Sequence, residues 1–359
     1  MVQSLNTLNK KKVYVVPIEP IDQRYTKQWY TNIPRLIKAA ADNVEVITVD
    51  GAKVADVTTP GAFLDFARTN VYKATQIEYI SRLFSDNLIE PWDQFLFTDA
   101  WHFGIPAVKY MSELLDIPVT IHGIWHAGAY DPTDILGMKL NPSWPTHFEL
   151  ALFNCIRYNY FATNFHKEMF AENLQVTQYL NSDKMIRSGQ PHDPIIQQIR
   201  DIRKQHVKQD IVAFPHRLNS DKQPEIAREL AKTFTFDITQ DKGLSKIEYY
   251  EHLAKAKVIF SCALHENLGI SVMEGVLAGA IPLVPDRASY SEMYHPDFKY
   301  PSEWTESWDK FIEYKEQLIN MIHHIIGNYD RYAETLNHQR LALRYKYLRA
   351  DAMINNIIK

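Results

Sequence analysis

The stretch KVIFSCALHENLGISVMEGVLAGAIPLVPD, residues 257–286, decides how the chain folds. It opens with a β-rich apolar run, passes through a short polar loop and an apolar helical segment, and ends in a second apolar run. Apolar strands joined by a helix are typical of a parallel sheet that is buried on both faces. Glu266 and Glu274 stand in this unit with seven residues between them. Two carboxylates therefore flank Gly269 at the start of an otherwise apolar helix.

The same alternation of β-rich runs and helical patterns continues through most of the chain. It predicts further strands at 13–18, 44–49, 94–99, 119–124, 160–163, 184–189, 211–215 and 234–239. The polar and highly charged residues 188–210 interrupt it. We therefore expect an α/β protein with two Rossmann-like domains that face a cleft. The first domain is expected at 1–190 and the second at 191–335, with a C-terminal helix at 336–359 packing back toward the first.

Bulk composition narrows the class of protein. A chain of 359 residues is too long for one ordinary core and suits two domains. The net charge of −4 argues against a non-specific nucleic-acid coat protein, although a local basic groove remains compatible with it. The N-terminus lacks an apolar signal core, and we expect no membrane span. Cys155 and Cys262 lie in apolar contexts, so we expect buried free thiols and a cytoplasmic protein.

The helix that follows Gly269 predicts an anion site. A helix N-terminus presents unpaired N–H groups and a partial positive charge, and diphosphate is a usual ligand there. Glu266 would accept hydrogen bonds from hydroxyls of a group attached to the phosphate, and Glu274 could reach the hydroxyls of a ribose. The alternative is a helix with one capping glutamate and one glutamate that faces solvent.

Two cations follow the strand at 211–215 in the stretch FPHRLNSDKQPE. Arg217 and Lys222 stand five positions apart at the same end of the predicted sheet. Beside a helix N-terminus they would neutralise a diphosphate and support its departure as a leaving group. The alternative is a solvated loop with two ordinary basic residues.

These residues carry a resemblance to a known family. The second half resembles retaining GT-B glycosyltransferases of the family 4 type, whose signature is an Arg…Lys pair followed by two glutamates with seven residues between them. It is most similar to the queuosine-tRNA mannosyltransferase branch, in the patterns FPHR…DK.PE and HE..G....E....G..PL.P.R..Y.E. The compact chain, rich in Lys, Asn, Ile and Tyr and without a basic amphipathic helix for membrane binding, also resembles viral DNA-modifying glycosyltransferases. The resemblance extends over about residues 211–300 and is mainly architectural over 1–190.

The resemblance implies a metal-independent enzyme that moves a sugar from a UDP- or GDP-sugar and requires no further cofactor. The first domain would bind the acceptor and the second the donor. Arg217 and Lys222 would bind the diphosphate, Glu266 the transferred sugar, and Glu274 the ribose. The full donor site would comprise Arg217, Lys222, His265, Glu266, Asn267, Leu268, Gly269, Ile270 and Glu274.

Candidates in the first domain follow its predicted strands. His122, His126 and Asp99 join Glu266 as candidate catalytic residues: either histidine could touch the donor sugar, and Asp99 could orient an acceptor hydroxyl or cap a helix. Packing inside the fold is the alternative for each histidine. The loop at 17–30 lacks the paired glycines of the family. The candidate acceptor-binding residues are Arg24, Tyr25, Trp29, His102, Trp125 and Tyr130.

The acceptor implied by the nearest resemblance is a modified base in nucleic acid. We expect a 5-hydroxymethyl-pyrimidine, such as hydroxymethylcytosine, in viral or phage DNA, which would place the enzyme in the host cytoplasm. Aromatic side chains would receive the extruded base. Transfer to queuosine in tRNA, or to a glycan or small metabolite, are alternatives. A non-catalytic nucleotide-sugar binding protein and a GT-B epimerase or phosphorylase are the rival classes. No metal-binding pattern stands out.

Overall fold

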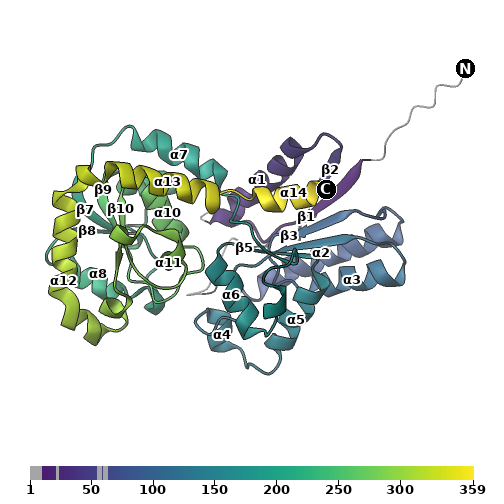
Figure 1. Cartoon of the computed structure of the whole chain (residues 1–359). Helices are drawn as coiled ribbons and strands as arrows, with labels where there is room; N and C mark the ends of the chain where they lie inside the picture. The colour runs from purple at the N-terminus through teal and green to yellow at the C-terminus, as the bar shows by residue number, and fades with distance from the viewer. Residues whose placement is uncertain (1–9, 22–23, 55–58, 60–63) are drawn as a thin grey trace, which may run out of the picture. The chain divides into compact units, whose positions relative to one another are not determined.

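The computed structural model describes residues 10–21, 24–54, 59 and 64–359. The chain forms two compact units (Figure 1). Unit 1 comprises Met1–Phe161, Lys167–Pro191 and Ala350–Lys359, and unit 2 comprises Ala162–His166 and His192–Arg349. The chain therefore returns to unit 1 for its last ten residues, after unit 2 is complete.

Unit 1 is built on a sheet of six parallel strands in the order β2-β1-β3-β4-β5-β6. The strands are β1 (Lys11–Val16), β2 (Val44–Thr48), β3 (Gln94–Phe97), β4 (Thr120–Ile124), β5 (Tyr158–Phe161) and β6 (Met185–Arg187). All four residues of β3 are buried, as expected for a strand covered on both faces. The parallel sheet that the apolar runs predict is confirmed.

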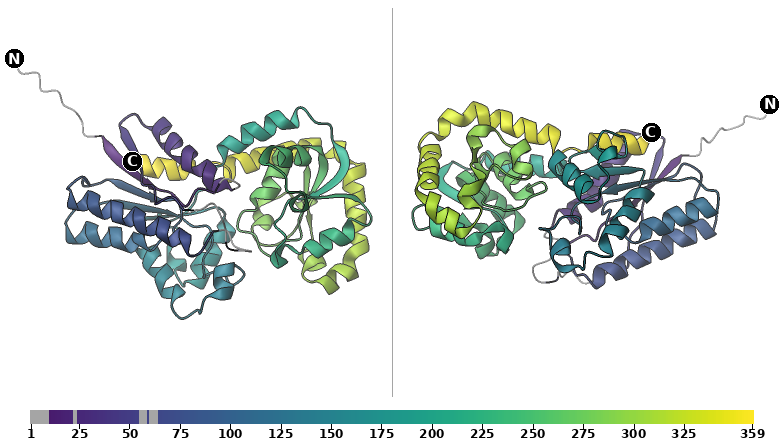
Figure 2. Two further views of the ribbon diagram at one scale, coloured as in Figure 1. Left: turned by 180° about the vertical axis from the view of Figure 1, so that it is seen from behind. Right: turned by 60° about the horizontal axis from the view of Figure 1, so that its bottom comes forward.

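Helices cover both faces of this sheet. They are α1 (Tyr25–Ala40), α2 (Arg68–Ser85), α3 (Gly104–Leu114), α4 (Ile135–Lys139), α5 (Pro145–Cys155), α6 (Asn164–Asn173) and α14 (Asp351–Ile358). The views in Figures 1 and 2 agree that α2 and α3 lie side by side, and that α1 and α14 lie against each other. The chain thus crosses back to the first domain, as predicted, but only α14 does so: residues 336–346 of the helix expected at 336–359 belong to a helix of unit 2 (Ala333–Lys346).

The loop expected at 17–30 is shorter in the structure, because α1 already begins at Tyr25. Trp29, Ile33 and Ile37 recur every four residues and bury one stripe of the helix together with Met353 and Ile357 of α14. Because of this buried stripe, the helix begins earlier in the chain than expected, within a segment whose sequence is polar and aromatic. Residues 22–23 of the expected loop lie outside the described residues.

Unit 2 contains five parallel strands in the order β11-β10-β9-β7-β8. The strands are β7 (Gln209–Phe214), β8 (Thr235–Ile238), β9 (Ala256–Phe260), β10 (Ile281–Pro285) and β11 (Lys299–Tyr300). The helices are α7 (Asp193–Arg203), α8 (Pro224–Leu230), α9 (Lys246–Lys255), α10 (Ile270–Leu277), α11 (Ser289–Met293), α12 (Trp308–Gly327) and α13 (Ala333–Lys346). The short elements β11 and α11 give no clear sequence signal.

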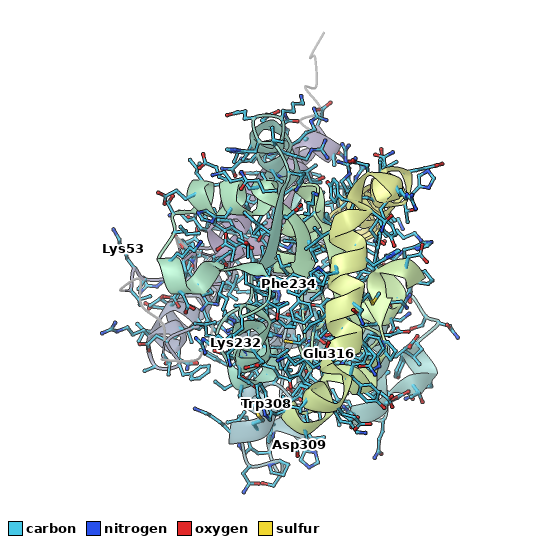
Figure 3. The ribbon with its side chains drawn as sticks, turned by 90° about the vertical axis from the view of Figure 1, so that its left-hand side faces the viewer. Lys53, Lys232, Phe234, Trp308, Asp309 and Glu316 are labelled. Carbon is cyan, nitrogen blue, oxygen red and sulfur yellow. The ribbon has the colours of Figure 1, made fainter. Side chains whose placement is uncertain are left out.

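Helix α12 closes one side of unit 2, which Figure 3 views directly. The ring of Phe234, labelled there, lies 4.6 Å from the ring of His323 on α12, measured between centroids. Lys315 on the same helix forms an ion pair of 2.8 Å with Glu229 on α8. The polar tail of the chain therefore supplies a packing surface for the second sheet.

Lys208 joins the ends of two helices in unit 2. Its Nζ donates to the carbonyl oxygens of Ala256 at 2.7 Å and Ala278 at 3.0 Å, the C-cap residues of α9 and α10. Burial lowers the pKa of Lys208 to about 7. The last carbonyls of a helix have no partner within the helix, so the N–H groups of Lys208 satisfy acceptors that would otherwise be unpaired. Lys208 therefore fixes both helices against the strand that follows it.

We expect Lys208→Met to lower the free energy of unfolding of unit 2 by about 2 kcal/mol, because it leaves carbonyl groups without their donor. Urea denaturation, followed by a signal specific to unit 2, measures the change. Lys204→Met, which alters an exposed lysine on the same segment, is the matched control. Equal stability of the two variants would contradict this account of Lys208.

Candidate functional site

Gly269 shapes the loop between β9 and α10. It occupies the N-cap position of α10 with φ 71° and ψ 51°, the left-handed region that favours glycine. A Cβ atom built there would lie 2.7 Å from Cε1 of Tyr290, so neither the backbone conformation nor the space admits a side chain. Glycine thus lets the chain turn directly into α10, whose first N–H groups have no acceptor within the helix and can bind an anion.

Lys222 and Glu266 form a buried ion pair at the carboxyl ends of β7 and β9. Lys222 Nζ lies 2.9 Å from Glu266 Oε1 and 3.0 Å from Asp221 Oδ2, and it donates to the carbonyl oxygen of His265 at 2.6 Å. Burial alone would lower the pKa of Lys222, but the two carboxylates outweigh it and raise that pKa. Burial likewise opposes the charge on Glu266, and Lys222 overcomes it and lowers the pKa of Glu266. Both groups are therefore charged at neutral pH.

His216 lies beside this pair and was not singled out from the sequence. Its Nε2 is 2.8 Å from Ser261 Oγ, and its Nδ1 is 3.9 Å from Glu266 Oε1. Burial lowers the pKa of His216 to about 4 despite the nearby Glu266, so the ring is neutral. Its position directly after β7, next to Arg217, is the signal that could have identified it.

Arg217 is the cation of the site that remains available to a ligand. Its side chain is exposed, and within the described ranges it takes part in no recorded hydrogen bond or ion pair. Lys222, in contrast, already directs its ammonium at Asp221, His265 and Glu266. The two cations that the sequence predicts therefore have different roles: Lys222 orients Glu266, and Arg217 carries the charge that a ligand can neutralise.

The remaining donor candidates lie along the same loop and helix. The carbonyl oxygen of Asn267 accepts from Thr163 Oγ1 at 2.9 Å, and Leu268 is buried in the core of unit 2. Ile270 is the first residue of α10, and His265 is half-buried. Of these, His265 lies at the Lys222–Glu266 pair through its carbonyl group, while Leu268 has a packing role.

Glu274 is buried on α10 and is held by helix α9. Tyr249 donates to its Oε2 at 2.9 Å, and Tyr250 donates to its Oε1 at 3.1 Å. Lys246 Nζ lies 2.7 Å from the same Oε1. The sequence places Glu274 on an apolar helix, but it gives no sign of these three donors from α9.

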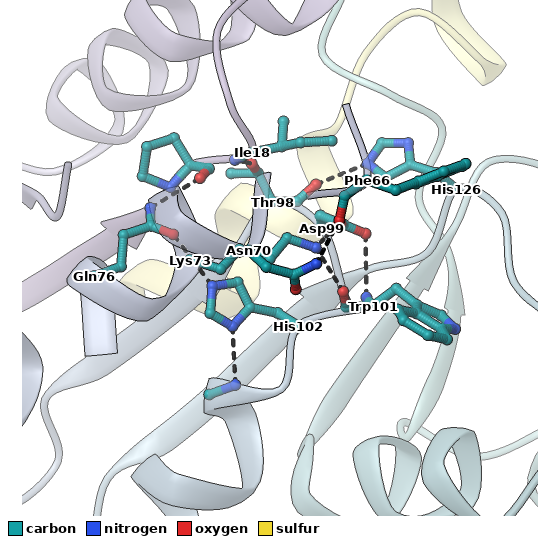
Figure 4. Close-up of polar contacts among 12 residues, drawn as sticks. Ile18, Phe66, Asn70, Lys73, Gln76, Thr98, Asp99, Trp101, His102 and His126 are labelled. Atoms are coloured by element: carbon teal, nitrogen blue, oxygen red, sulfur yellow. Dashed lines mark hydrogen bonds and ion pairs between the residues drawn. The ribbon is translucent and has the colours of Figure 1, made fainter. Parts of the chain in front are cut away.

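In unit 1, Asp99 follows β3 and is neutralised by Lys73 (Figure 4). Asp99 Oδ2 lies 2.8 Å from Lys73 Nζ, which also donates to the carbonyl oxygen of Trp101 at 2.7 Å. Asp99 Oδ1 accepts from the backbone N–H of Trp101 at 3.1 Å. Both carboxylate oxygens are thus bonded inside the fold, and the structure supports an architectural role rather than contact with an acceptor hydroxyl.

His102 and His126 also appear in Figure 4. They differ in exposure. His102 is buried between Gln76 Oε1 at 3.1 Å and the backbone N–H of Gly104 at 3.0 Å, and burial lowers its pKa well below the usual range. His126 is half-buried: its Nε2 lies 2.7 Å from the carbonyl oxygen of Thr98, and Tyr25 Oη lies 3.2 Å from its Nδ1. Burial also lowers the pKa of His126, so its imidazole is neutral. His126 remains a candidate, whereas His102 is enclosed.

His122 lies in the middle of β4 rather than at its end. Its Nδ1 is 2.8 Å from Tyr160 Oη and its Nε2 is 2.8 Å from Gln94 Oε1, both on neighbouring strands. The ring is fully buried, and burial lowers the pKa of His122 to about 3. The structure therefore does not support the prediction of a catalytic role for His122.

Burial also removes most of the aromatic acceptor candidates. Trp29 is buried in one apolar cluster of unit 1, and Trp125 and Tyr130 are buried in another; Trp125 Nε1 donates to Asn159 Oδ1 at 2.9 Å. Arg24 occupies the N-cap position of α1, and Tyr25 is half-buried against His126. Because side chains in the core cannot contact a ligand, Tyr25 and Arg24 are the acceptor candidates that the structure leaves.

Glu149 is a buried carboxyl that the sequence did not point out. Its Oε1 accepts from Trp101 Nε1 at 2.8 Å and from the backbone N–H of Ala129 at 2.5 Å, so it ties α5 to the loop that carries His126. Burial raises the pKa of Glu149 to about 7, although the N–H groups of Trp101, Ala129 and Tyr130 favour the carboxylate. Its second oxygen accepts no hydrogen bond within the described ranges.

The described residues give no membrane-crossing helix and no metal cluster. No helix of the described chain has the length and apolar character that crossing a membrane requires. No three His, Cys, Asp or Glu side chains among the same residues gather as ligands for a metal ion would.

We expect Glu149→Gln to stabilise the protein more at pH 8 than at pH 4.5. Between 4.5 and about 7 the folded chain holds a proton that the unfolded chain has released, so stability falls as the pH rises through this window. Glutamine keeps the shape and removes this cost, which is about 3 kcal/mol above pH 7 for a rise from 4.5 to about 7. Thermal unfolding across the pH range measures it, with the exposed Glu113→Gln as control. A pH-independent difference would contradict the assignment.

Comparison with known structures supports the architecture. No protein-family model matches the chain. The sucrose-phosphate synthase of Thermosynechococcus elongatus is similar at 11% identity with a TM-score of 0.62, covering 97% of each chain. HepE of Anabaena in complex with UDP and glucose is similar at 13% identity with a TM-score of 0.58, covering 97% of this chain and 98% of that chain. The catalytic domain of starch synthase IV from Arabidopsis thaliana, bound to ADP and acarbose, gives 12% identity and a TM-score of 0.54 over 97% and 98%. The chain therefore has the GT-B fold that the sequence predicts.

Proposed function

We propose that the chain is a glycosyltransferase that moves a sugar from a nucleotide-diphosphate donor to a hydroxyl group. The observation that carries the proposal is the arrangement at the carboxyl ends of β7 and β9: an exposed Arg217, a largely buried Lys222–Glu266 pair, and a helix opened by Gly269. The neighbouring structures add support, because one is a complex with UDP and glucose and another is bound to ADP and acarbose.

The proposed donor site assigns one task to each group. The diphosphate lies at the N-terminus of α10, where backbone N–H groups and Arg217 balance its charge. Glu266, held in place by Lys222, accepts hydrogen bonds from the hydroxyls of the transferred sugar.

The reaction follows from these tasks without a protein nucleophile. The oxygen of the acceptor hydroxyl forms a bond to the anomeric carbon while the bond from that carbon to the diphosphate oxygen breaks. The acceptor proton passes to the leaving phosphate, and Arg217 and the helix N-terminus stabilise the negative charge that develops there. Attack on the face that the diphosphate leaves gives retention of configuration, as the family resemblance implies.

The finer proposal for the acceptor is a 5-hydroxymethyl-pyrimidine in DNA, which rests on the sequence resemblance alone. The loops that follow β1 to β4 favour a second candidate, a neutral saccharide or metabolite hydroxyl. Their described carboxylates are Glu19, Asp50, Asp65, Asp99, Asp131 and Asp134, and their described cations are Arg24 and Lys53. Lys73 neutralises Asp99, but the remaining excess of carboxylates opposes a polyanion, whose binding depends on Lys and Arg.

An assay with radiolabelled UDP-, ADP- and GDP-sugars tests the function and the acceptor together. Each donor is incubated with hydroxymethylated DNA, unmodified DNA, tRNA, or a neutral oligosaccharide. Label in hydroxymethylated DNA alone supports the nucleobase acceptor, and label in the oligosaccharide alone supports the neutral acceptor. Donor binding without transfer or hydrolysis in any arm would indicate a nucleotide-sugar binding protein instead.

We expect Arg217→Ala to lower the rate of sugar transfer by about 100-fold, because it removes the available cation at the leaving group. The melting temperature should stay unchanged, since Arg217 is exposed and has no recorded partner in the described part of the chain. Arg228→Ala, which removes an exposed arginine of α8, is the matched control and should retain activity. Full activity of Arg217→Ala would exclude this arginine from the donor site.

A further inference from the structure

The carboxylate of Glu274 already has most of its hydrogen-bonding capacity in use. A carboxylate offers about four lone-pair positions on its two oxygens. Tyr250 and Lys246 both bind Oε1, at 3.1 Å and 2.7 Å, whereas Tyr249 is the recorded donor to Oε2 at 2.9 Å. One position on Oε2 therefore remains, which is too few for both hydroxyls of a vicinal diol.

Lys246 has hydrogen-bond donors that Glu274 does not use. Its ammonium carries three N–H donors and directs one at Glu274. The side chain of Lys246 is 44% exposed, whereas that of Glu274 is 5% exposed, so the lysine is the member of the pair that a ligand meets first.

The position of Lys246 is fixed by its surroundings. Lys246 is the first residue of α9, directly after Ser245, whose side chain and Glu248 form a capping box. Its Nζ lies 5.0 Å from the ring centroid of Tyr249 and 4.7 Å from that of Tyr250, distances at which a cation is attracted to the ring face. The same two tyrosines hold Glu274, so the donor and the acceptor form one preorganised group.

We propose that Lys246 and Glu274 together recognise the cis-diol of the donor ribose, and that Lys246 determines specificity for a ribonucleotide. One ribose hydroxyl donates to the remaining position on Glu274 Oε2, and the other accepts from Lys246 Nζ. This inference rests on the proposed function and adds to it, because the family resemblance assigns the ribose to Glu274 alone.

Two other roles for Lys246 are compatible with the same contacts and give different results. If the pair only joins α9 to α10, loss of Lys246 lowers stability without changing the preference between ribose and deoxyribose. If the ribose displaces Lys246 from Glu274, loss of Lys246 strengthens binding, because the competitor is gone.

Calorimetric titration of the full chain tests the proposal. The ligands are UDP, ADP and GDP, followed by the 2′-deoxy and 3′-deoxy forms of the nucleotide that binds. We expect the wild type to prefer the ribonucleotide by about tenfold, the change produced by one hydrogen bond to a charged group. Lys246→Met should bind the ribonucleotide about tenfold more weakly and lose its discrimination against one of the two deoxy forms. Lys246→Arg, which keeps a donor, should retain part of it.

Lys242→Met is the matched control, because Lys242 precedes α9 and pairs with Asp237 instead of Glu274. It should keep the wild-type preference. Unchanged discrimination in Lys246→Met, an equal loss for the ribo and deoxy forms, or tighter binding by this variant would each overturn the inference. Failure of the wild type to bind any nucleoside diphosphate would instead overturn the proposed function. Melting temperatures of all variants confirm that each is folded.

Discussion

The ion pair between Lys222 and Glu266 is the interaction on which the candidate donor site depends. Removing two charges from water costs several kcal/mol for each ion, and only close mutual contact offsets this cost. The pair holds the loops after β7 and β9 together, with help from the hydrogen bond between Leu264 N–H and the carbonyl oxygen of Asp221 at 2.8 Å. Glu266 is therefore oriented before any ligand arrives, and Arg217 is left as the cation that a ligand can neutralise.

The fold could be predicted because its strongest signals are local. The apolar runs that become β7, β9 and β10 are short, continuous and separated by helical patterns, which is how a doubly covered parallel sheet is encoded. Elements that depend on distant contacts were missed or shifted. The first turn of α1 is one example, since its helical state rests on packing against α14, more than 300 residues away.

The site was only partly predictable for the same reason. Arg217, Lys222, Glu266 and Gly269 follow strand ends at fixed spacings, so a motif can place them. His122 and His126 differ in their position relative to the end of β4, which extends to Ile124. His122 lies inside the strand, between Gln94 and Tyr160, whereas His126 lies after it. The partners of a buried side chain come from neighbouring strands and helices, and a single sequence does not show those neighbours.

The return of the chain to unit 1 has a consequence for the order in which the protein is made. Met353 and Ile357 of α14 complete the apolar layer that Trp29, Ile33 and Ile37 of α1 form on the sheet. A ribosome reaches these residues only after it has synthesised all of unit 2. On the growing chain, unit 2 can finish folding while unit 1, although begun first, still exposes one apolar face of its sheet. Unit 1 is thus synthesised first and completed last. Until α14 is made, the apolar face that it covers is the surface of the nascent chain that needs protection from aggregation.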